Sequence, residues 1–203
     1  MPRFARAEVQ SAFEHWWQVG NVGEDWTAWA ELFVQDVTYQ DYFWGPLHGR
    51  AEVTAWINAV MKGVPDIYTV YEWHVIEDEK VVFECQNRRD NPSAEGPPYF
   101  DFPGMTVLRY AGDGRWESEF DYWDRSGARR ATEAFQAACA RAGVTDPLQT
   151  ATRRHWPDGP DWARTDDEPR PSWLRHPELP GITHPGQLQK LLAEVRARPL
   201  SST

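Results

Sequence analysis

Apolar side chains in the first part of the chain recur at the spacing of helices. Val9, Phe13, Trp16 and Trp17 lie three or four residues apart, which is typical of one face of an amphipathic helix. Similar apolar stripes follow twice, separated by a segment of strand-like composition. We predict helices over residues 5–19, 26–33 and 50–61, and a strand over residues 34–42.

After Pro65 the pattern changes to that of a β-sheet. Segments rich in Val, Tyr, Phe and Trp are separated by turn-forming residues such as Gly112-Asp113-Gly114. A helix that Gly143 ends follows the last of these segments. We predict four successive antiparallel strands over residues 67–76, 80–90, 98–110 and 115–124, and a helix over 128–142.

This order of elements favours an α+β fold. Helices that precede consecutive antiparallel strands pack on one face of a sheet. A curved antiparallel sheet wrapped around N-terminal helices forms a cone, and the open end of a cone is a natural ligand cavity.

Charge and proline content divide the chain near residue 142. Residues 1–142 carry 13 basic and 23 acidic side chains, whereas residues 143–203 carry 8 of each and 9 of the 16 prolines. We predict an acidic domain over 1–142 and a Pro/Trp-rich extension over 143–203, mostly irregular with a helix at 186–197. The extension holds three tryptophans, so we expect it to lie along the domain or a partner subunit, covering the pocket mouth or clasping the partner.

Composition narrows the range of functions. The net charge of −10 argues against a nucleic-acid partner, which Lys and Arg patches would bind. No apolar run is long enough to span a membrane and no signal-peptide core follows the N-terminus, so we expect a cytoplasmic protein. The two cysteines lack metal-ligand spacing, and we expect no metal or other cofactor. Twelve tryptophans indicate a large aromatic core or an apolar small-molecule pocket.

Ionisable side chains gather in three segments that we predict to be strands. Alternate side chains of a strand face the core, so some of these ionisable groups should be buried. Residues two apart share a face of a strand, so Tyr39 points with Asp41 and Arg88 with Asp90. If the strand ends meet inside the cone, one arginine lies between Asp90 and Asp121. Two close carboxyl groups have split pKa values, so that one acts as acid and the other as base, and a guanidinium can hold both. The alternative is a surface ladder of ion pairs at a sheet edge.

The chain resembles the NTF2-like superfamily over roughly residues 5–142. The resemblance rests on the opening helix, on Asp25-Trp26-x-x-Trp29-x-x-Leu32-Phe33, and on His48-Gly49-Arg50-Ala51-Glu52-Val53 before the third helix. This superfamily includes SnoaL-type polyketide cyclases, ketosteroid isomerases, scytalone dehydratase and limonene-epoxide hydrolase. The resemblance implies a cone-shaped α+β domain that forms a homodimer through the exposed face of its sheet.

The closer resemblance is to limonene-epoxide hydrolase, whose Asp-Arg-Asp triad combines Arg-x-Asp with an Asp-Tyr-Phe-Asp motif. This sequence has Arg88-Arg89-Asp90 and Asp121-Tyr122-Trp123-Asp124, and it has Tyr39-Gln40-Asp41 where that family has Tyr-Gln-Asn. The resemblance implies that Asp121 is the general base on water, that Asp90 is the general acid toward the epoxide oxygen, that Arg88 bridges the two, and that Tyr39 orients the water. Asp41 replaces an amide and is itself a candidate acid or base.

Strand parity leaves the position of this triad open. Val81, Phe83 and Cys85 form the apolar face of their strand, while Arg88 and Asp90 belong to the other face. The polar face looks into a wet cavity, or a β-bulge shifts the register, or the triad lies outside the cone.

Three functions are consistent with these residues. The first is epoxide hydrolysis of a small, largely apolar substrate. The second is a cyclase, dehydratase or isomerase that moves protons within a polyketide- or steroid-like ring, with Asp41, Asp121 and His74 as acid–base candidates. The third is a non-catalytic small-ligand-binding module. The substrate-binding candidates are His74, Trp29, Trp56 and Trp123.

Overall fold

The computed structural model describes residues 2–146, 154–168 and 170–197, and it confirms the predicted α+β class. In the first third of the chain the predicted helices and strand are present, and a π-helical turn over Gln18–Val22 extends the first helix. Asp25 begins the second helix by accepting the amide N–H of Ala28 at 3.1 Å. The elements are α1 (Arg6–Trp17), α2 (Trp26–Glu31), β1 (Phe33–Asp41), β2 (Gly45–His48) and α3 (Arg50–Gly63).

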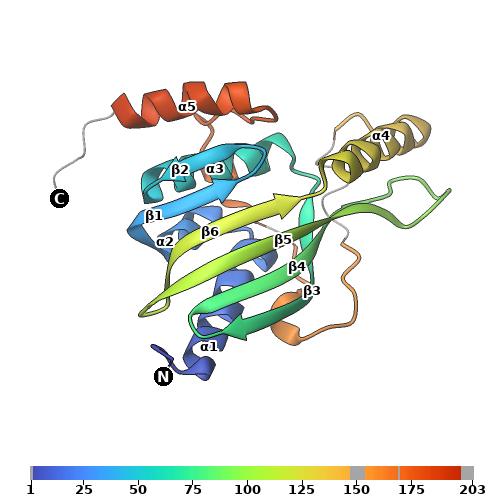
Figure 1. The fold of residues 1–203 in the computed structure, drawn as a ribbon. Coiled ribbons are helices and arrows are strands. Elements are labelled where there is room, and N and C mark those ends of the chain that lie inside the picture. The colour runs from blue at the N-terminus through green and yellow to red at the C-terminus, as the bar shows by residue number, and fades with distance from the viewer. Residues whose placement is uncertain (1, 147–153, 169, 198–203) are drawn as a thin grey trace.

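The sheet is mixed rather than purely antiparallel as expected. Its strand order is β2-β1-β6-β5-β4-β3, and β1 runs parallel to β6 (Figure 1). The short strand β2 was not predicted because its Gly45 and Pro46 are typical of turns, but an edge strand tolerates proline. The remaining strands are β3 (Tyr68–Glu77), β4 (Lys80–Asp90), β5 (Tyr99–Gly112) and β6 (Arg115–Trp123).

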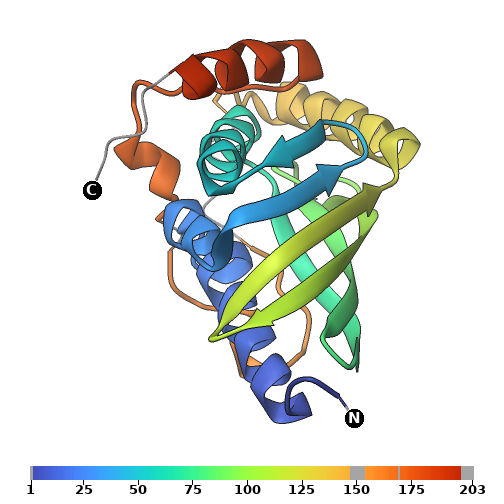
Figure 2. The ribbon, with the colours of Figure 1, turned by 60° about the vertical axis from the view of Figure 1, so that its left-hand side comes forward.

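Helices α1, α2 and α3 pack against one face of the curved sheet (Figure 2). The interface is mostly aromatic, and the Phe83 ring of β4 lies 5.4–5.5 Å from the rings of Phe13, Trp16 and Trp17 of α1. These four side chains are at most 2% exposed. Burial of rings in offset and edge-to-face contacts therefore fixes α1 on the sheet.

Helix α4 (Arg125–Ala142) begins three residues earlier than predicted. Asp124, which the pattern assigned to the preceding strand, accepts the Ser126 amide N–H at 2.9 Å and caps the helix. The buried Arg89 of β4 ties α4 to the sheet by donating to Thr132 Oγ1 at 2.7 Å. The same guanidinium pairs with Asp66 in the loop after α3.

The extension lies along the domain, and it shares the domain's hydrophobic core through Trp173, Ile182 and three leucines. The predicted helix is present as α5 (Pro185–Ala197), which contacts α3. In the described part of the extension, the short 3₁₀ helices Asp161–Ala163 and Ser172–Arg175 precede it. Among the described residues no helix is both long and apolar enough to cross a membrane.

Candidate active site

A cluster of acidic and hydroxyl side chains lies on the inner, helix-covered face of the sheet. Strand β1 contributes Tyr39, β6 contributes Glu119 and Asp121, and β5 contributes Thr106. In the register of the sheet Tyr39 is the partner of Glu119, and Asp121 is the partner of Thr106, which in turn pairs with Phe83 of the apolar core. Cross-strand partners share a face, so the four polar side chains meet inside the fold.

A chain of hydrogen bonds connects this cluster. The Tyr39 hydroxyl donates to Asp121 Oδ2 and lies 3.1 Å from Glu119 Oε1, and Thr106 Oγ1 donates to Asp121 Oδ1. A phenol has only one hydrogen, so it cannot donate to both carboxyl groups. The arrangement is satisfied when Glu119 is a neutral acid that donates to the Tyr39 oxygen. Glu119 then donates a hydrogen bond to Tyr39, and Tyr39 donates one to Asp121.

The pKa directions agree with that order. Burial, with the nearby charge of Asp121 as a second cause, raises the pKa of Glu119 well above its usual value. Burial also raises the pKa of Asp121 to about 6, and the hydrogen bonds from Thr106 and Tyr39 oppose part of this rise. Glu119 and Tyr39 are each 2% exposed, whereas Asp121 is only partly buried. Asp121 is thus the most exposed member of the cluster.

Asp41 lies next to the cluster but has a different set of partners. Its Oδ1 accepts the amide N–H groups of Phe43 and Trp44 at 2.6 and 2.8 Å, and its Oδ2 accepts the Trp123 indole N–H at 3.1 Å. Burial raises the pKa of Asp41, while these three donors oppose the rise. Asp41 therefore holds the turn between β1 and β2, and its charge is a further cause of the raised pKa of Asp121.

The bridge predicted for Arg88 is wrong. Arg88 donates through Nη2 to Asp101 at 2.8 Å and through Nη1 to the His155 carbonyl at 2.7 Å. Asp90 Oδ1 instead accepts the Tyr68 hydroxyl at 2.6 Å and lies 2.8 Å from His155 Nδ1. Within the described residues Arg88 makes no hydrogen bond or ion pair with either Asp90 or Asp121.

Strand parity explains this outcome. The ladder between β4 and β5 is unbroken from Lys80 to Asp90, so no bulge turns Arg88 toward the side of Phe83. The β4 residue in line with Asp121 is Phe83, and Arg88 lies five residues further along, about 16 Å at the rise of a strand. Arg88 and Asp90 therefore belong to the outer face, where the extension covers and buries them.

The predicted substrate-binding residues fall in two places. Trp29 and Trp56 pack on the Tyr39 ring, with centroids 6.3 and 4.8 Å away, and both are buried. Trp123 packs against the rings of Phe43 and Phe102 at the end of β6. His74 makes no hydrogen bond with the described residues of the acidic cluster: its ring nitrogens lie 2.7 Å from the Tyr71 hydroxyl and 2.9 Å from Gln10 Oε1.

Glu119 and Thr106 were not among the predicted site residues. A signal for Glu119 was present, because it lies two positions before Asp121 on the same strand face. Thr106 carries no signal of its own, since its role depends on the register between β5 and β6. In the described part of the chain no group of three or more His, Cys, Asp or Glu side chains could hold a metal ion.

The fold and this inner cluster define a cone-shaped α+β domain with buried acidic groups. The sequence matches the SnoaL-like domain family over residues 9–119, which is more than half of the chain, so the chain belongs to this family. No curated protein matches the sequence.

Solved structures with this fold share little sequence with the chain. A candidate SnoaL-like polyketide cyclase from Jannaschia sp. CCS1 is 19% identical with a TM-score of 0.51, covering 63% of this chain and 93% of its own. Another from Shewanella putrefaciens CN-32 is 13% identical with a TM-score of 0.52, covering 65% and 88%. TerC, co-crystallized with polyporic acid, is 13% identical with a TM-score of 0.51, covering 62% and 98%. Each leaves about a third of this chain without a counterpart.

Proposed function

We propose that this protein is a cofactor-independent enzyme that moves a proton within a small, largely apolar ring compound, in the manner of a cyclase or isomerase. The observation that carries the proposal is the position of Asp121, partly exposed at the inner face and hydrogen-bonded by two buried hydroxyl groups. A carboxyl group with a pKa of about 6 is well suited to accept and return a proton near neutral pH.

In the proposed step the Asp121 carboxylate takes a proton from a carbon next to a carbonyl group. The electrons of the broken C–H bond form a C=C bond, and the carbonyl oxygen takes the negative charge. When a C=C bond lies next to that carbon, the carbonyl re-forms as Asp121 delivers the proton to the far end of the conjugated system, which shifts the double bond and yields the isomerised product.

Exchange of carbon-bound hydrogen tests this proposal without knowledge of the natural substrate. Purified protein is incubated with 2-tetralone in deuterium oxide, and deuterium at the carbons next to the carbonyl is followed by NMR. We expect exchange above the buffer rate with the wild type and exchange at the buffer rate with Asp121→Asn. Equal exchange by both proteins would contradict the proposal.

Epoxide hydrolysis is the second candidate. It is favoured by the contact of Tyr39 with Asp121. The resemblance to limonene-epoxide hydrolase implies that Tyr39 orients the water and that Asp121 is the general base on it. The separation of Arg88 and Asp90 from Asp121 removes the other part of that triad. Incubation with an epoxide panel in oxygen-18 water decides between the candidates, because only hydrolysis leaves the label in a diol.

We also propose a homodimer that forms through the outer face of the sheet. Two cross-strand rows of this face are mostly apolar, and Trp73, Val75, Met105 and Tyr122 are between 40% and 52% exposed. Contiguous apolar surface of this kind is typical of an interface. Light scattering should give twice the chain mass for the wild type and the chain mass for a Val75→Lys, Met105→Glu double variant. A monomeric wild type would contradict this proposal.

A further inference from the structure

Residues 154–163 of the extension, which we call the strap, run from the start of β3 to α1 (Figure 1). Near the end of the strap Trp162 inserts its half-buried indole among four rings of the domain. The centroid distances are 4.8 Å to Tyr71, 5.7 Å to Phe13, 6.1 Å to His74 and 6.3 Å to Trp17. All four contacts are edge-to-face, with interplanar angles of 68–78°. Tyr71, Phe13, His74 and Trp17 together form a site with the size and geometry for one planar aromatic ring. We call this site the aromatic slot.

The aromatic slot leads toward the acidic cluster. Phe13 and Trp17, which form its floor, both contact Phe83. Phe83 is the cross-strand partner of Thr106, the residue that donates to Asp121. A single ring thus separates the floor of the slot from the side chains that hold the proposed base.

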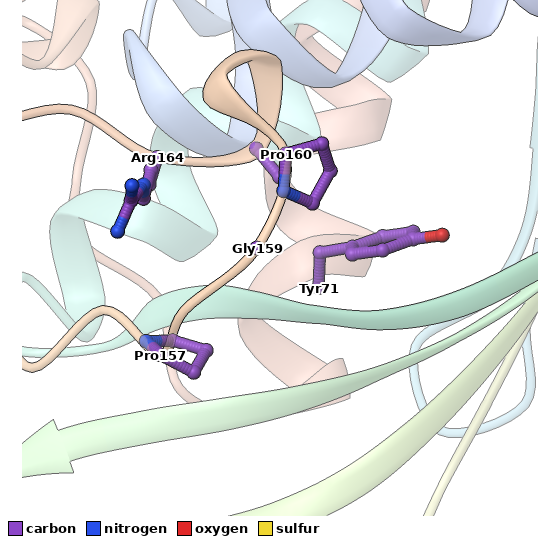
Figure 3. Close-up of a pocket in the computed structure, with 6 residues that line it drawn as sticks. Tyr71, Pro157, Gly159, Pro160 and Arg164 are labelled. Atoms are coloured by element: carbon purple, nitrogen blue, oxygen red, sulfur yellow. The ribbon is translucent and has the colours of Figure 1, made fainter.

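Polar contacts with the described residues bind the strap to the domain at its first end only. Its first residues are anchored by the ion pair of Arg154 with the buried Glu24 and by the contact of His155 with Asp90. Between Pro157 and Ala163 the described strap makes no hydrogen bond to the domain. Trp162 makes ring contacts there, and Ala163 is buried against the hydrophobic core. A small pocket remains between this part of the strap and Tyr71, as Figure 3 shows, lined also by Gly159 and Pro160. By contrast, Trp173 and Ile182 further along the extension are buried in the core.

We propose that the aromatic slot is a binding site for a planar aromatic ring and that the strap is its gate, with Trp162 occupying the slot when no such ring is bound. The claim that this ring belongs to the substrate rests on the proposed function. The claim that the slot binds an aromatic ring does not. A ligand must compete with the Trp162 indole, so its apparent affinity is reduced by the fraction of molecules in which the strap is closed. Any change that weakens the strap therefore strengthens ligand binding.

Free indole tests the gate, because it has the ring that the slot already holds. Its binding is followed through the His74 ring signals in NMR titrations. We expect Trp162→Ala, or Trp162→Leu if the alanine variant does not fold, to bind indole at least tenfold more tightly than the wild type. His155→Ala keeps Trp162 but loses an anchor, and we expect at least threefold tighter binding. Trp173→Ala removes a buried indole elsewhere in the extension and should leave the His74 response unchanged.

Two results would overturn the proposal: unchanged His74 signals when indole is added to either Trp162 variant, or an affinity for His155→Ala equal to that of the wild type. The readout is binding and not turnover. If Asp121→Asn left deuterium exchange intact while indole bound as expected, the proposed function would fail and the gate would stand.

Discussion

The two faces of the sheet carry acidic groups in two different environments. On the inner face Asp121 is surrounded by hydroxyl groups and a second carboxyl group, Glu119, without a basic side chain among its hydrogen-bond partners. On the outer face Asp90 lies beside Tyr68 and His155, and the neighbouring Arg88 pairs with Asp101. On the inner face, burial and the charge of Asp41 raise the pKa of Asp121 to about 6, whereas the outer set binds the start of the strap to the sheet. The proton transfer that we propose belongs to the inner face, and the outer face anchors the start of the strap.

The largest expected effect comes from a matched pair of Asp→Asn variants, one on each face. Asp121→Asn should reduce deuterium exchange by at least a factor of about 10³, because an amide cannot accept the proton. Asp90→Asn should retain exchange within about threefold. It should also lower the free energy of unfolding by about 1–3 kcal/mol, because Tyr68 and His155 lose their charged partner. Denaturant unfolding and the exchange assay measure both quantities, and equal losses of exchange would remove the distinction between the faces.

A second test concerns Arg88, which the sequence pattern placed between two catalytic carboxyl groups. Arg88→Gln should lower the free energy of unfolding by about 1–3 kcal/mol, since it removes the buried cation that pairs with Asp101 and donates to the His155 carbonyl. Exchange per folded molecule should stay within about threefold of the wild type. A loss as large as that of Asp121→Asn would restore the bridging role.

The overall fold could be predicted from the sequence because long periodic segments report their own structure. The spacing of Phe13, Trp16 and Trp17 is enough to define α1. The short β2 could not be predicted, because it exists only through pairing with β1. At the site, the resemblance assigned Tyr39 and Asp121 to one site and they are in contact, whereas the position of Arg88 depended on which face of β4 the helices cover.

A smaller effect is expected at Tyr39. Tyr39→Phe removes a hydrogen bond that lowers the pKa of Asp121, so the pKa should rise above about 6. The pH dependence of exchange should then move to higher pH, and the rate at pH 7 should fall by about tenfold, as loss of one hydrogen bond to a charged group implies. An unchanged pH profile would show that Tyr39 does not act on Asp121.

The smallest effect is expected for Glu119→Gln. If Glu119 is a neutral acid that donates to Tyr39, a glutamine amide can replace that donation, and exchange should change by less than about threefold. Glu119→Leu lacks a donor and serves as the control, with a larger loss expected. A severe loss in Glu119→Gln would indicate that Glu119 itself takes up or releases the proton.

The central claim is that Asp121 titrates in the inner cluster near neutral pH, and carboxyl carbon-13 NMR tests it most directly. The Asp121 signal is assigned by its absence in Asp121→Asn, and its shift is followed from pH 3 to pH 9. We expect a midpoint at about pH 6 for Asp121, with the pKa of Glu119 also raised by its burial. A midpoint near the ordinary aspartate value of about 3.9, with Glu119 ionised by pH 6, would contradict the account.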